Sequence, residues 1–112
     1  MIFFKNESNP DCPNEIFFEA YEDDSLCGNC KLTLSDGKAI IKTIAFDNGK
    51  PYIGEGLVKS AFNFAALKNY YMGYCECENT NGFLDNMNFE KKDDVYYNDI
   101  PTILQGNCCK KH

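Results

Sequence analysis

The sequence predicts a single α+β domain in which helices pack on a mixed, mostly antiparallel sheet. Alternating and β-branched segments separated by turn residues fill the region from Glu15 to Phe46, as in an antiparallel meander. An amphipathic helix follows, and then an apolar strand from Tyr71 to Cys77. Because a strand, a crossover helix and a further strand form a parallel pair, the expected order is (β)βββ-α-β-α-ββ with one parallel strand pair.

The strands of the first half end at clusters of turn-forming residues. A loop rich in Asn, Pro and Asp reaches Asn14. Two further turns are expected at Glu22–Ser25 and Ser35–Gly37, where acidic residues and glycine tolerate a reversed backbone. The strands between these turns are expected at Ile2–Lys5, Glu15–Tyr21, Leu26–Leu34 and Lys38–Phe46.

The central helix is predicted from apolar residues that recur with helical spacing. Lys59, Ser60 and Asn63 occupy its other side, so one face of the helix packs against the sheet. The residues of this packed face are Leu57, Val58, Ala61, Phe62 and Ala65.

The last third of the chain is expected to add a short helix and a hairpin. Phe83, Leu84 and Met87 form one face of the helix. The hairpin strands are expected at Phe89–Lys92 and Val95–Ile100, around a turn at Asp93 and Asp94.

The charge balance excludes several classes of partner. The net charge of −6, from 17 acidic and 11 basic residues, argues against a nucleic-acid backbone or an anionic membrane. No run approaches the roughly 18 apolar residues of a membrane helix. Lys5 interrupts the apolar start of the chain, so no signal peptide is predicted. The expected location is the cytoplasm.

Seven cysteines raise the question of disulfides or metal. An odd count without a secretion signal favours reduced thiols. Cys27 and Cys30 have the spacing of half a zinc site, but they lie in a predicted strand, where residues three apart face opposite sides. Cys75 and Cys77 share a face of an apolar strand, where cysteine behaves as a small hydrophobic residue. We therefore expect ordinary thiols and no metal ligands.

The segment from Lys42 to Ala66 carries the strongest indication of a ligand. A β-branched and aromatic strand enters a loop containing Gly49, Gly54 and Gly56, and the loop opens into the central helix. Loop N–H groups and the positive end of a helix together form a seat for a phosphate or pyrophosphate. The alternative is that these glycines only turn the strand into the helix.

The motifs of the chain, taken in order, resemble the C-terminal two-thirds of a GNAT-type N-acetyltransferase. Leu26-Cys27-Gly28 looks like the strand-opening ivG of that family, and Ile44-Ala45-Phe46 is similar to its laV strand end. The segment from Ile53 to Val58 is similar to GIGxxLL, and Asn88-Phe89 stands in place of the GF after the last helix. The likeness covers residues 15–104.

The resemblance implies acetyl-CoA as the cofactor and an acyltransferase activity that moves the acetyl group to an amine. In that family the pantetheine arm hydrogen-bonds along the end of one strand, and the pyrophosphate sits on the following loop and helix start. Lys50 and Lys59 would add charge nearby. The coenzyme A positions implied in this chain are Thr43, Ile44, Ala45, Phe46, Tyr52, Ile53, Gly54, Glu55, Gly56, Leu57 and Lys59.

The glycine motif fits the chain in two registers. Gly54 and Gly56 match both family glycines, but Lys59 and Ser60 then face the core. Alternatively, Gly54 matches the second glycine and Tyr52 takes the place of the first, which shortens the loop and keeps the apolar helix face packed. We favour the second register, because misfacing a helix costs several kcal/mol of burial and shortening a loop costs little.

The resemblance does not supply the catalytic residues, which stay unknown. The strand Ala39–Ile44 has no Glu or His, where family members often carry the base, and Leu84 stands at the position of the common acid, a Tyr. The remaining candidates are the tail residue His112 and the strand tyrosines Tyr70, Tyr71, Tyr96 and Tyr97.

The N-terminus is shorter than in that family. Residues 1–14 stand in place of the first helices, which wall the acceptor site, and residues 105–112 are expected to form a flexible tail of the single domain 1–112. A second subunit would complete the wall, or the chain is a catalytically degenerate interaction module that works as a dimer. A zinc or thiol protein based on the cysteines is the remaining alternative.

Overall fold

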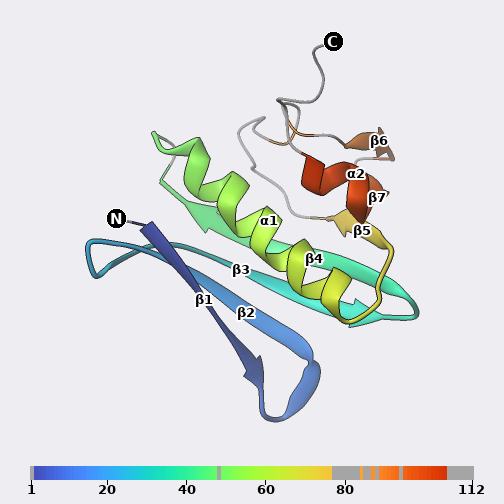
Figure 1. Ribbon diagram of the computed structural model, residues 1–112, viewed down its shortest axis with the longest axis horizontal. Coiled ribbons are helices and arrows are strands. Elements are labelled where there is room, and N and C mark those ends of the chain that lie inside the picture. Colours follow the sequence, from blue (N-terminus) through green and yellow to red (C-terminus); the bar gives the residue numbers. More distant parts are fainter. Residues whose placement is uncertain are drawn as a thin grey trace.

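The computed structural model of the protein describes residues 2–47, 49–76, 84, 87, 89–93 and 95–105. These residues form a seven-stranded sheet in the order β1-β2-β3-β4-β5-β7-β6, and two helices (Figure 1). Among the described strands, only β4 and β5 pair in parallel, which confirms the predicted α+β class. The elements are β1 Ile2–Asn9, β2 Cys12–Glu22, β3 Ser25–Ser35, β4 Lys38–Phe46, α1 Pro51–Leu67, β5 Met72–Cys75, β6 Glu90–Lys92, β7 Val95–Asp99 and α2 Ile100–Gln105.

The turns of the meander lie where the sequence predicts them. Asp23, Asp24 and Asp36 have positive φ angles of 52°, 71° and 52°, and Gly37 has a φ of 77°. Aspartate and glycine adopt this left-handed conformation at low cost, so they reverse the chain between β2, β3 and β4. The three predicted strands of the meander are thereby confirmed: β4 has the predicted ends, and the ends of β2 and β3 are shifted by one to three residues.

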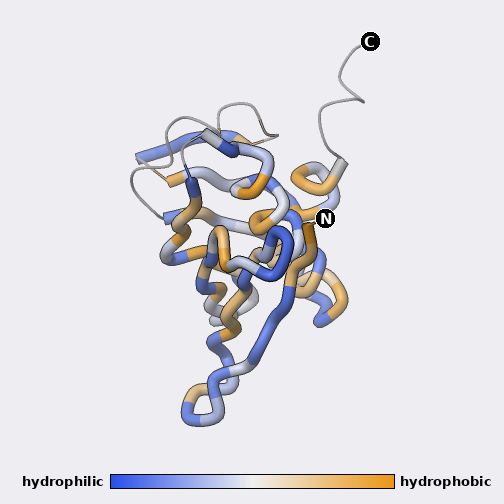
Figure 2. The backbone as a smooth tube through the Cα atoms, turned by 90° about the vertical axis from the view of Figure 1, so that its left-hand side faces the viewer, coloured by the Kyte–Doolittle hydropathy of each residue, from blue (hydrophilic) through white to orange (hydrophobic). Residues whose placement is uncertain are grey.

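The N-terminal segment differs from the expectation. The predicted loop up to Asn14 is wrong, because β1 continues to Asn9 and β2 already begins at Cys12. Pairing to β2 holds this polar part of β1 extended, with Asn6 opposite Phe18 and Glu7 opposite Phe17. In Figure 2 the strand runs from a hydrophobic start to a hydrophilic end at the projecting tip of the hairpin.

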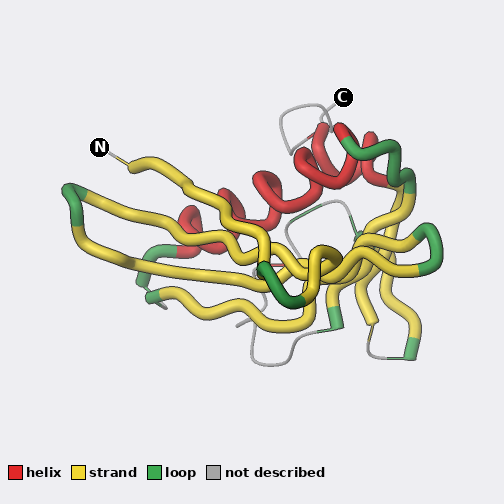
Figure 3. The backbone as a smooth tube through the Cα atoms, turned by 90° about the horizontal axis from the view of Figure 1, so that it is seen from below, coloured by secondary structure: helices red, strands yellow, loops and turns green. Residues whose placement is uncertain are grey.

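The core lies between the sheet and α1. All five residues predicted for the packed helix face are at most 1% exposed, which confirms the helical periodicity. They meet the inward side chains of the meander, among them Phe18, Leu32 and Ile41. Both described helices lie on the same side of the sheet (Figure 3). No described helix is long and apolar enough to cross a membrane.

Two further boundaries correct the expectation. Helix α1 begins at Pro51, six positions before Leu57, so two of the three glycines predicted in the loop, Gly54 and Gly56, belong to the helix, and Gly49 lies in the turn before it. Ile100 does not end the last strand but begins α2, and its side chain is buried.

The short helix predicted before the hairpin lies mostly outside the described residues. Within that stretch Leu84 and Met87 are described, and both are buried in the core. Cys77, Asn88 and the tail from residue 106, with His112, also lie outside the described residues.

Candidate functional site

The two parallel strands part in the middle of the sheet. β4 and β5 pair over four residues, from Lys38 opposite Met72 to Ile41 opposite Cys75. One further hydrogen bond joins the Glu76 N–H to the Ile41 carbonyl oxygen at 3.0 Å. Beyond it, β4 continues to Phe46 and pairs, among the described residues, with β3 alone. In the described part of the chain, no strand pairs with the other edge of β4 from Lys42 to Ala45, and we call this stretch the free edge of β4. An extended ligand can use such an edge for backbone hydrogen bonds.

A β-bulge lies at the point where the strands part. Lys31 pairs with Thr43 and Leu32 with Ile41, so Lys42 is the extra residue of β4. A bulge bends its strand and increases the local twist, which accounts for the divergence of β4 from β5. The ammonium of Lys42 lies 3.1 Å from the carboxylate of Glu76, at the same point. The bulge therefore places one basic and one acidic group beside the free edge.

The turn between β4 and α1 leaves few backbone donors for an anion. The first four backbone positions of a helix have no helical acceptor for their N–H groups, and here these positions are Lys50, Pro51, Tyr52 and Ile53. Lys50 N–H donates to the Asp47 carbonyl and Ile53 N–H to the Lys50 carbonyl, both at 2.9 Å, while proline has no N–H. Among the described residues, the Tyr52 N–H is the one backbone donor of these positions without an acceptor.

The predicted glycine cradle is consequently corrected. Gly54 and Gly56 lie inside α1, past the first turn, where N–H groups bond to carbonyls four residues earlier. Their role is close packing. A β-carbon on residue 54 would lie 2.8 Å from the ring of Phe46, and one on residue 56 would overlap the ring of Phe4. The glycines let these two rings lie against the helix.

The charges at the helix start are already partly neutralised. Lys50 Nζ lies 2.9 Å from the Glu22 carboxylate, and this hydrogen bond and its charge raise the pKa of Lys50. The Asp47 side chain accepts the N–H of Gly49 at 2.9 Å, which places a second carboxylate near the turn. The positive end of α1 still favours an anion, but with fewer free groups than the sequence motif suggests.

The structure brings the two halves of the predicted coenzyme A site together. Gly28 of β3 lies between both halves. A β-carbon added to this residue would contact the Ala45 carbonyl oxygen of β4 and the Ile53 and Leu57 side chains of α1. The free edge of β4 thus ends beside the start of the helix. Ile53, Gly54 and Leu57 are buried, whereas Thr43, Ala45 and Tyr52 are exposed and Ile44, Phe46, Glu55, Gly56 and Lys59 are half-buried.

The cysteines of the suspected zinc motif lie in different surroundings. Cys30 is buried, with its Sγ 4.0 Å from the Leu57 carbonyl oxygen, and Cys27 sits at a bulge of β3, where its thiol donates to the Ala20 carbonyl at 3.4 Å. Within the described residues, no three His, Cys, Asp or Glu side chains are grouped so that they could hold a metal ion.

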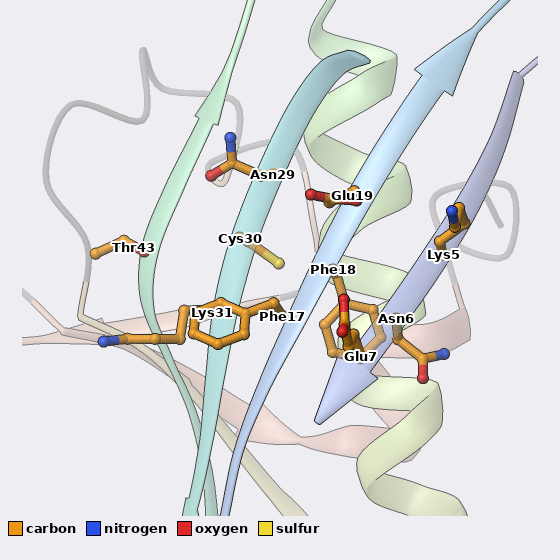
Figure 4. Close-up of a pocket in the computed structure, with 10 residues that line it drawn as sticks. All are labelled: Lys5, Asn6, Glu7, Phe17, Phe18, Glu19, Asn29, Cys30, Lys31 and Thr43. Atoms are coloured by element: carbon orange, nitrogen blue, oxygen red, sulfur yellow. The ribbon is translucent and has the colours of Figure 1, made fainter. Parts of the chain in front are cut away.

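Cavities lie on the face of the sheet opposite α1. One, of about 500 Å³, spans four strands, and Figure 4 shows Lys5 at one side and Thr43 at the other. Its floor is formed by cross-strand neighbours, with Phe17 between Glu7 and Lys31. A second cavity, of about 560 Å³, lies over β4, β5, β7 and the β6–β7 turn. The two flank the bulge from opposite sides.

The candidate catalytic tyrosines are dispersed. Tyr71 is 62% exposed, Tyr96 packs edge-on against Phe89, and Tyr97 stacks with Tyr74 with ring centroids 6.3 Å apart. Leu84, at the family's acid position, is buried. Sequence reasoning missed Glu76, because its proximity to Lys42 links residues 34 positions apart and has no local signature.

Comparisons with known proteins identify the fold. A putative GNAT-family acetyltransferase from Desulfovibrio desulfuricans superposes with a TM-score of 0.73 at 13% identity, over 89% of this chain and 99% of that chain. An N-acetyltransferase from Staphylococcus aureus Mu50 has a TM-score of 0.65 at 18% identity, over 90% and 99%. The paia N-acetyltransferase from Thermoplasma acidophilum, solved with coenzyme A, has a TM-score of 0.57 at 18% identity, over 75% and 58%.

These likenesses establish a GNAT-like α+β fold. The chain spans almost the whole of the Desulfovibrio and Staphylococcus proteins but little more than half of the Thermoplasma one. No protein-family model and no curated protein sequence matches the chain.

Proposed function

We propose that the protein binds acetyl-CoA and transfers its acetyl group to an amine. The observation that carries this proposal is the free edge of β4 from Lys42 to Ala45, which has no strand partner among the described residues and lies beside the start of α1. The arm of coenzyme A is an extended chain with two amides, and such a ligand satisfies the unpaired backbone groups of a strand edge. The solved structures that share this fold include one in complex with coenzyme A.

The proposed orientation follows from the polarity of the two parts. The pantetheine arm lies along Thr43–Ala45, with the thioester near the bulge at Lys42. The pyrophosphate lies at the start of α1, where the helix dipole and the Tyr52 N–H favour negative charge. Because neighbouring N–H groups already have acceptors, the strand edge contributes more to this affinity than the pyrophosphate seat does.

A binding experiment tests this proposal. Acetyl-CoA and S-acetylpantetheine, which lacks the nucleotide and the pyrophosphate, are titrated into the protein by calorimetry. We expect both to bind, with dissociation constants within about tenfold of each other, or about 1.4 kcal/mol. Hydrogen exchange should show new protection for amides between Thr43 and Phe46, while the β2–β3 turn serves as the internal control.

The contrary results are equally specific. Absence of heat with millimolar acetyl-CoA, together with unchanged exchange in β4, would refute coenzyme A binding. Binding of acetyl-CoA without any binding of acetylpantetheine would keep the ligand but contradict the dominant role of the strand edge.

A second candidate function is that of a non-catalytic module that pairs with another copy of the chain. It is favoured by the face of the sheet opposite α1, which exposes Phe3, Phe17 and Leu26 by 40%, 41% and 53%. Exposed apolar side chains gathered on one face are typical of an interaction surface. Sedimentation analysis with and without acetyl-CoA tests this function, and a monomer at all concentrations would contradict it.

A further inference from the structure

The cavity beside β5 is an aromatic pocket open to solvent. Its volume of about 560 Å³ lies in the range of small-molecule sites. The rings of Tyr74 and Tyr97 stack at an interplanar angle of 25°, and the ammonium of Lys38 lies 5.5 Å from the Tyr74 ring centroid. The remaining walls are apolar or charged and come from Ile40, Met72, Glu76, Lys92, Asp93 and Val95.

Glu76 lies at the end of this pocket where β4 and β5 part. Within the residues that the structure describes, its N–H makes the last hydrogen bond between the two segments, to the Ile41 carbonyl oxygen at 3.0 Å. Its carboxylate is 40% exposed and held by Lys42 at 3.1 Å. One residue thus lines the aromatic pocket and borders the free edge of β4, where the proposed orientation places the thioester.

We propose that this pocket holds the acceptor, a primary amine carried on an aromatic body, and that Glu76 takes the proton that the amine loses. The inference rests on the acetyl-CoA binding proposed above. The amine nitrogen attacks the thioester carbonyl, so a carbon–nitrogen bond forms and the carbon–sulfur bond breaks. The sulfur leaves with the electron pair as the coenzyme A thiolate. The nitrogen proton passes to the Glu76 carboxylate, directly or through one water, and from there to the thiolate or solvent.

The chemistry of the pocket selects the class of amine. The stacked tyrosines offer an aromatic face to a planar, apolar group. Lys38 and Lys92 line the same space, Lys42 lies beside Glu76 at its end, and these charges repel a ligand with several positive charges. Glu76 and Asp93 attract a single ammonium group. The ammonium gives one proton to solvent before its nitrogen attacks, and Glu76 takes the second proton during the transfer. An arylalkylamine meets these conditions, and a polyamine does not.

The neighbouring cavity across β4 does not offer an equivalent base. Its carboxylates, Glu19 and Glu7, lie on β2 and β1, which places them two and three strands from β4. At about 4.8 Å per strand this is about 10 Å or more from the free edge. Glu19 also accepts the Tyr21 hydroxyl at 2.9 Å. Glu76, which follows β5, therefore lies nearer to the parting strands than either of these two carboxylates.

The test compares Glu76→Gln with a matched control, Glu7→Gln, which removes an exposed carboxylate from β1 on the same face. Phenethylamine and spermidine are supplied with acetyl-CoA, and the acetylated products are measured by mass spectrometry, because the protein's own thiols would react with a thiol dye. We expect acetylation of phenethylamine in preference to spermidine. Glu76→Gln should lower kcat by about 100-fold or more, and Glu7→Gln should not.

A third variant separates binding of the amine from proton transfer. Tyr74→Leu keeps an apolar side chain but removes the stacked ring, so KM for phenethylamine should rise while kcat changes little. The dissociation constant of acetyl-CoA should stay unchanged in all three variants.

The outcomes distinguish this inference from the function on which it rests. If the wild-type protein does not bind acetyl-CoA, the proposed function fails. If acetyl-CoA binds but Glu76→Gln keeps the full rate, or spermidine is the better acceptor, this inference fails alone. If acetyl-CoA binds and no amine is acetylated, phenethylamine is titrated into the acetyl-CoA complex by calorimetry. The absence of binding there overturns the acceptor pocket, and binding without acetylation overturns the role of Glu76.

Discussion

The ring of Phe46 lies against Gly54, so close that a β-carbon on residue 54 would come within 2.8 Å of two ring carbons. This contact joins the end of β4 to the first turns of α1. It therefore fixes the distance between the free strand edge and the helix start, the two parts of the candidate site.

The first prediction concerns Gly54→Ala. Alanine normally stabilises a helix interior relative to glycine by up to about 1 kcal/mol, so propensity alone predicts a more stable protein. Here the added methyl group meets an aromatic ring in a packed core, and overpacking costs about 1–3 kcal/mol. We expect net destabilisation, measured as a lower urea midpoint.

Two controls identify the cause of that loss. Gly49→Ala places its methyl group 3.5 Å from Asp47 Oδ1, an ordinary contact, and should change stability little. Phe46→Leu combined with Gly54→Ala should recover part of the stability, because the smaller side chain makes room. A higher urea midpoint for Gly54→Ala would contradict the close contact between residue 54 and the Phe46 ring.

The second prediction concerns the turn before α1. Asp47→Ala removes the acceptor of the Gly49 N–H, and with it up to about 1.5 kcal/mol of stability. The same change removes a carboxylate near the proposed pyrophosphate seat and frees a backbone donor. We therefore expect a less stable protein that binds acetyl-CoA several-fold more tightly by calorimetry. Asp11→Ala, on the exposed β1–β2 turn, is the control and should alter neither quantity.

The third prediction concerns the ion pair at the bulge. Lys42 and Glu76 are 44% and 40% exposed, and an exposed ion pair contributes about 0–1 kcal/mol. Lys42→Met and Glu76→Gln should therefore each leave the urea midpoint nearly unchanged. A double-mutant cycle with a coupling energy well above 1 kcal/mol would contradict this, and it would mean that effects of Glu76→Gln on turnover include a loss of structure.

Periodicity predicted the parts of the fold that depend on local pattern. The buried face of α1, from Leu57 to Ala65, and the order of the meander strands follow from apolar spacing alone. The early start of α1 did not follow, because glycine in a helix interior is locally unfavourable. Glycine is required there by two rings from other elements, Phe46 of β4 against Gly54 and Phe4 of β1 against Gly56.

Long-range pairing accounts for the other differences. The polar end of β1 has no alternating apolar pattern, and its extended form depends on its partner β2. Glu76 reaches Lys42 only because β5 is laid beside β4 in parallel. The start of α2 is indicated locally by Asp99, whose side chain caps the helix by accepting the N–H of Thr102, three residues later. The β-branched and aromatic run from Val95 to Ile100 favoured a strand over this cap.

The last prediction concerns this start of α2. The Asp99 carboxylate accepts the Thr102 N–H at 3.0 Å and the Thr102 hydroxyl at 2.8 Å, and these bonds hold the pKa of Asp99 below its ordinary value of 3.8. A lowered pKa in the folded state means that the stabilisation is present above the unfolded value and is lost as the pH falls through the folded value. Asp99→Asn keeps an acceptor but does not titrate. The difference in unfolding free energy between wild type and Asp99→Asn should therefore be constant near neutral pH and shrink below about pH 3.8, measured by urea unfolding across that range.

Asp99→Ala, which removes the acceptor, should be less stable than Asp99→Asn at every pH. A difference that grows on acidification would show that the carboxylate is protonated more easily in the folded state, against the hydrogen bonds to Thr102.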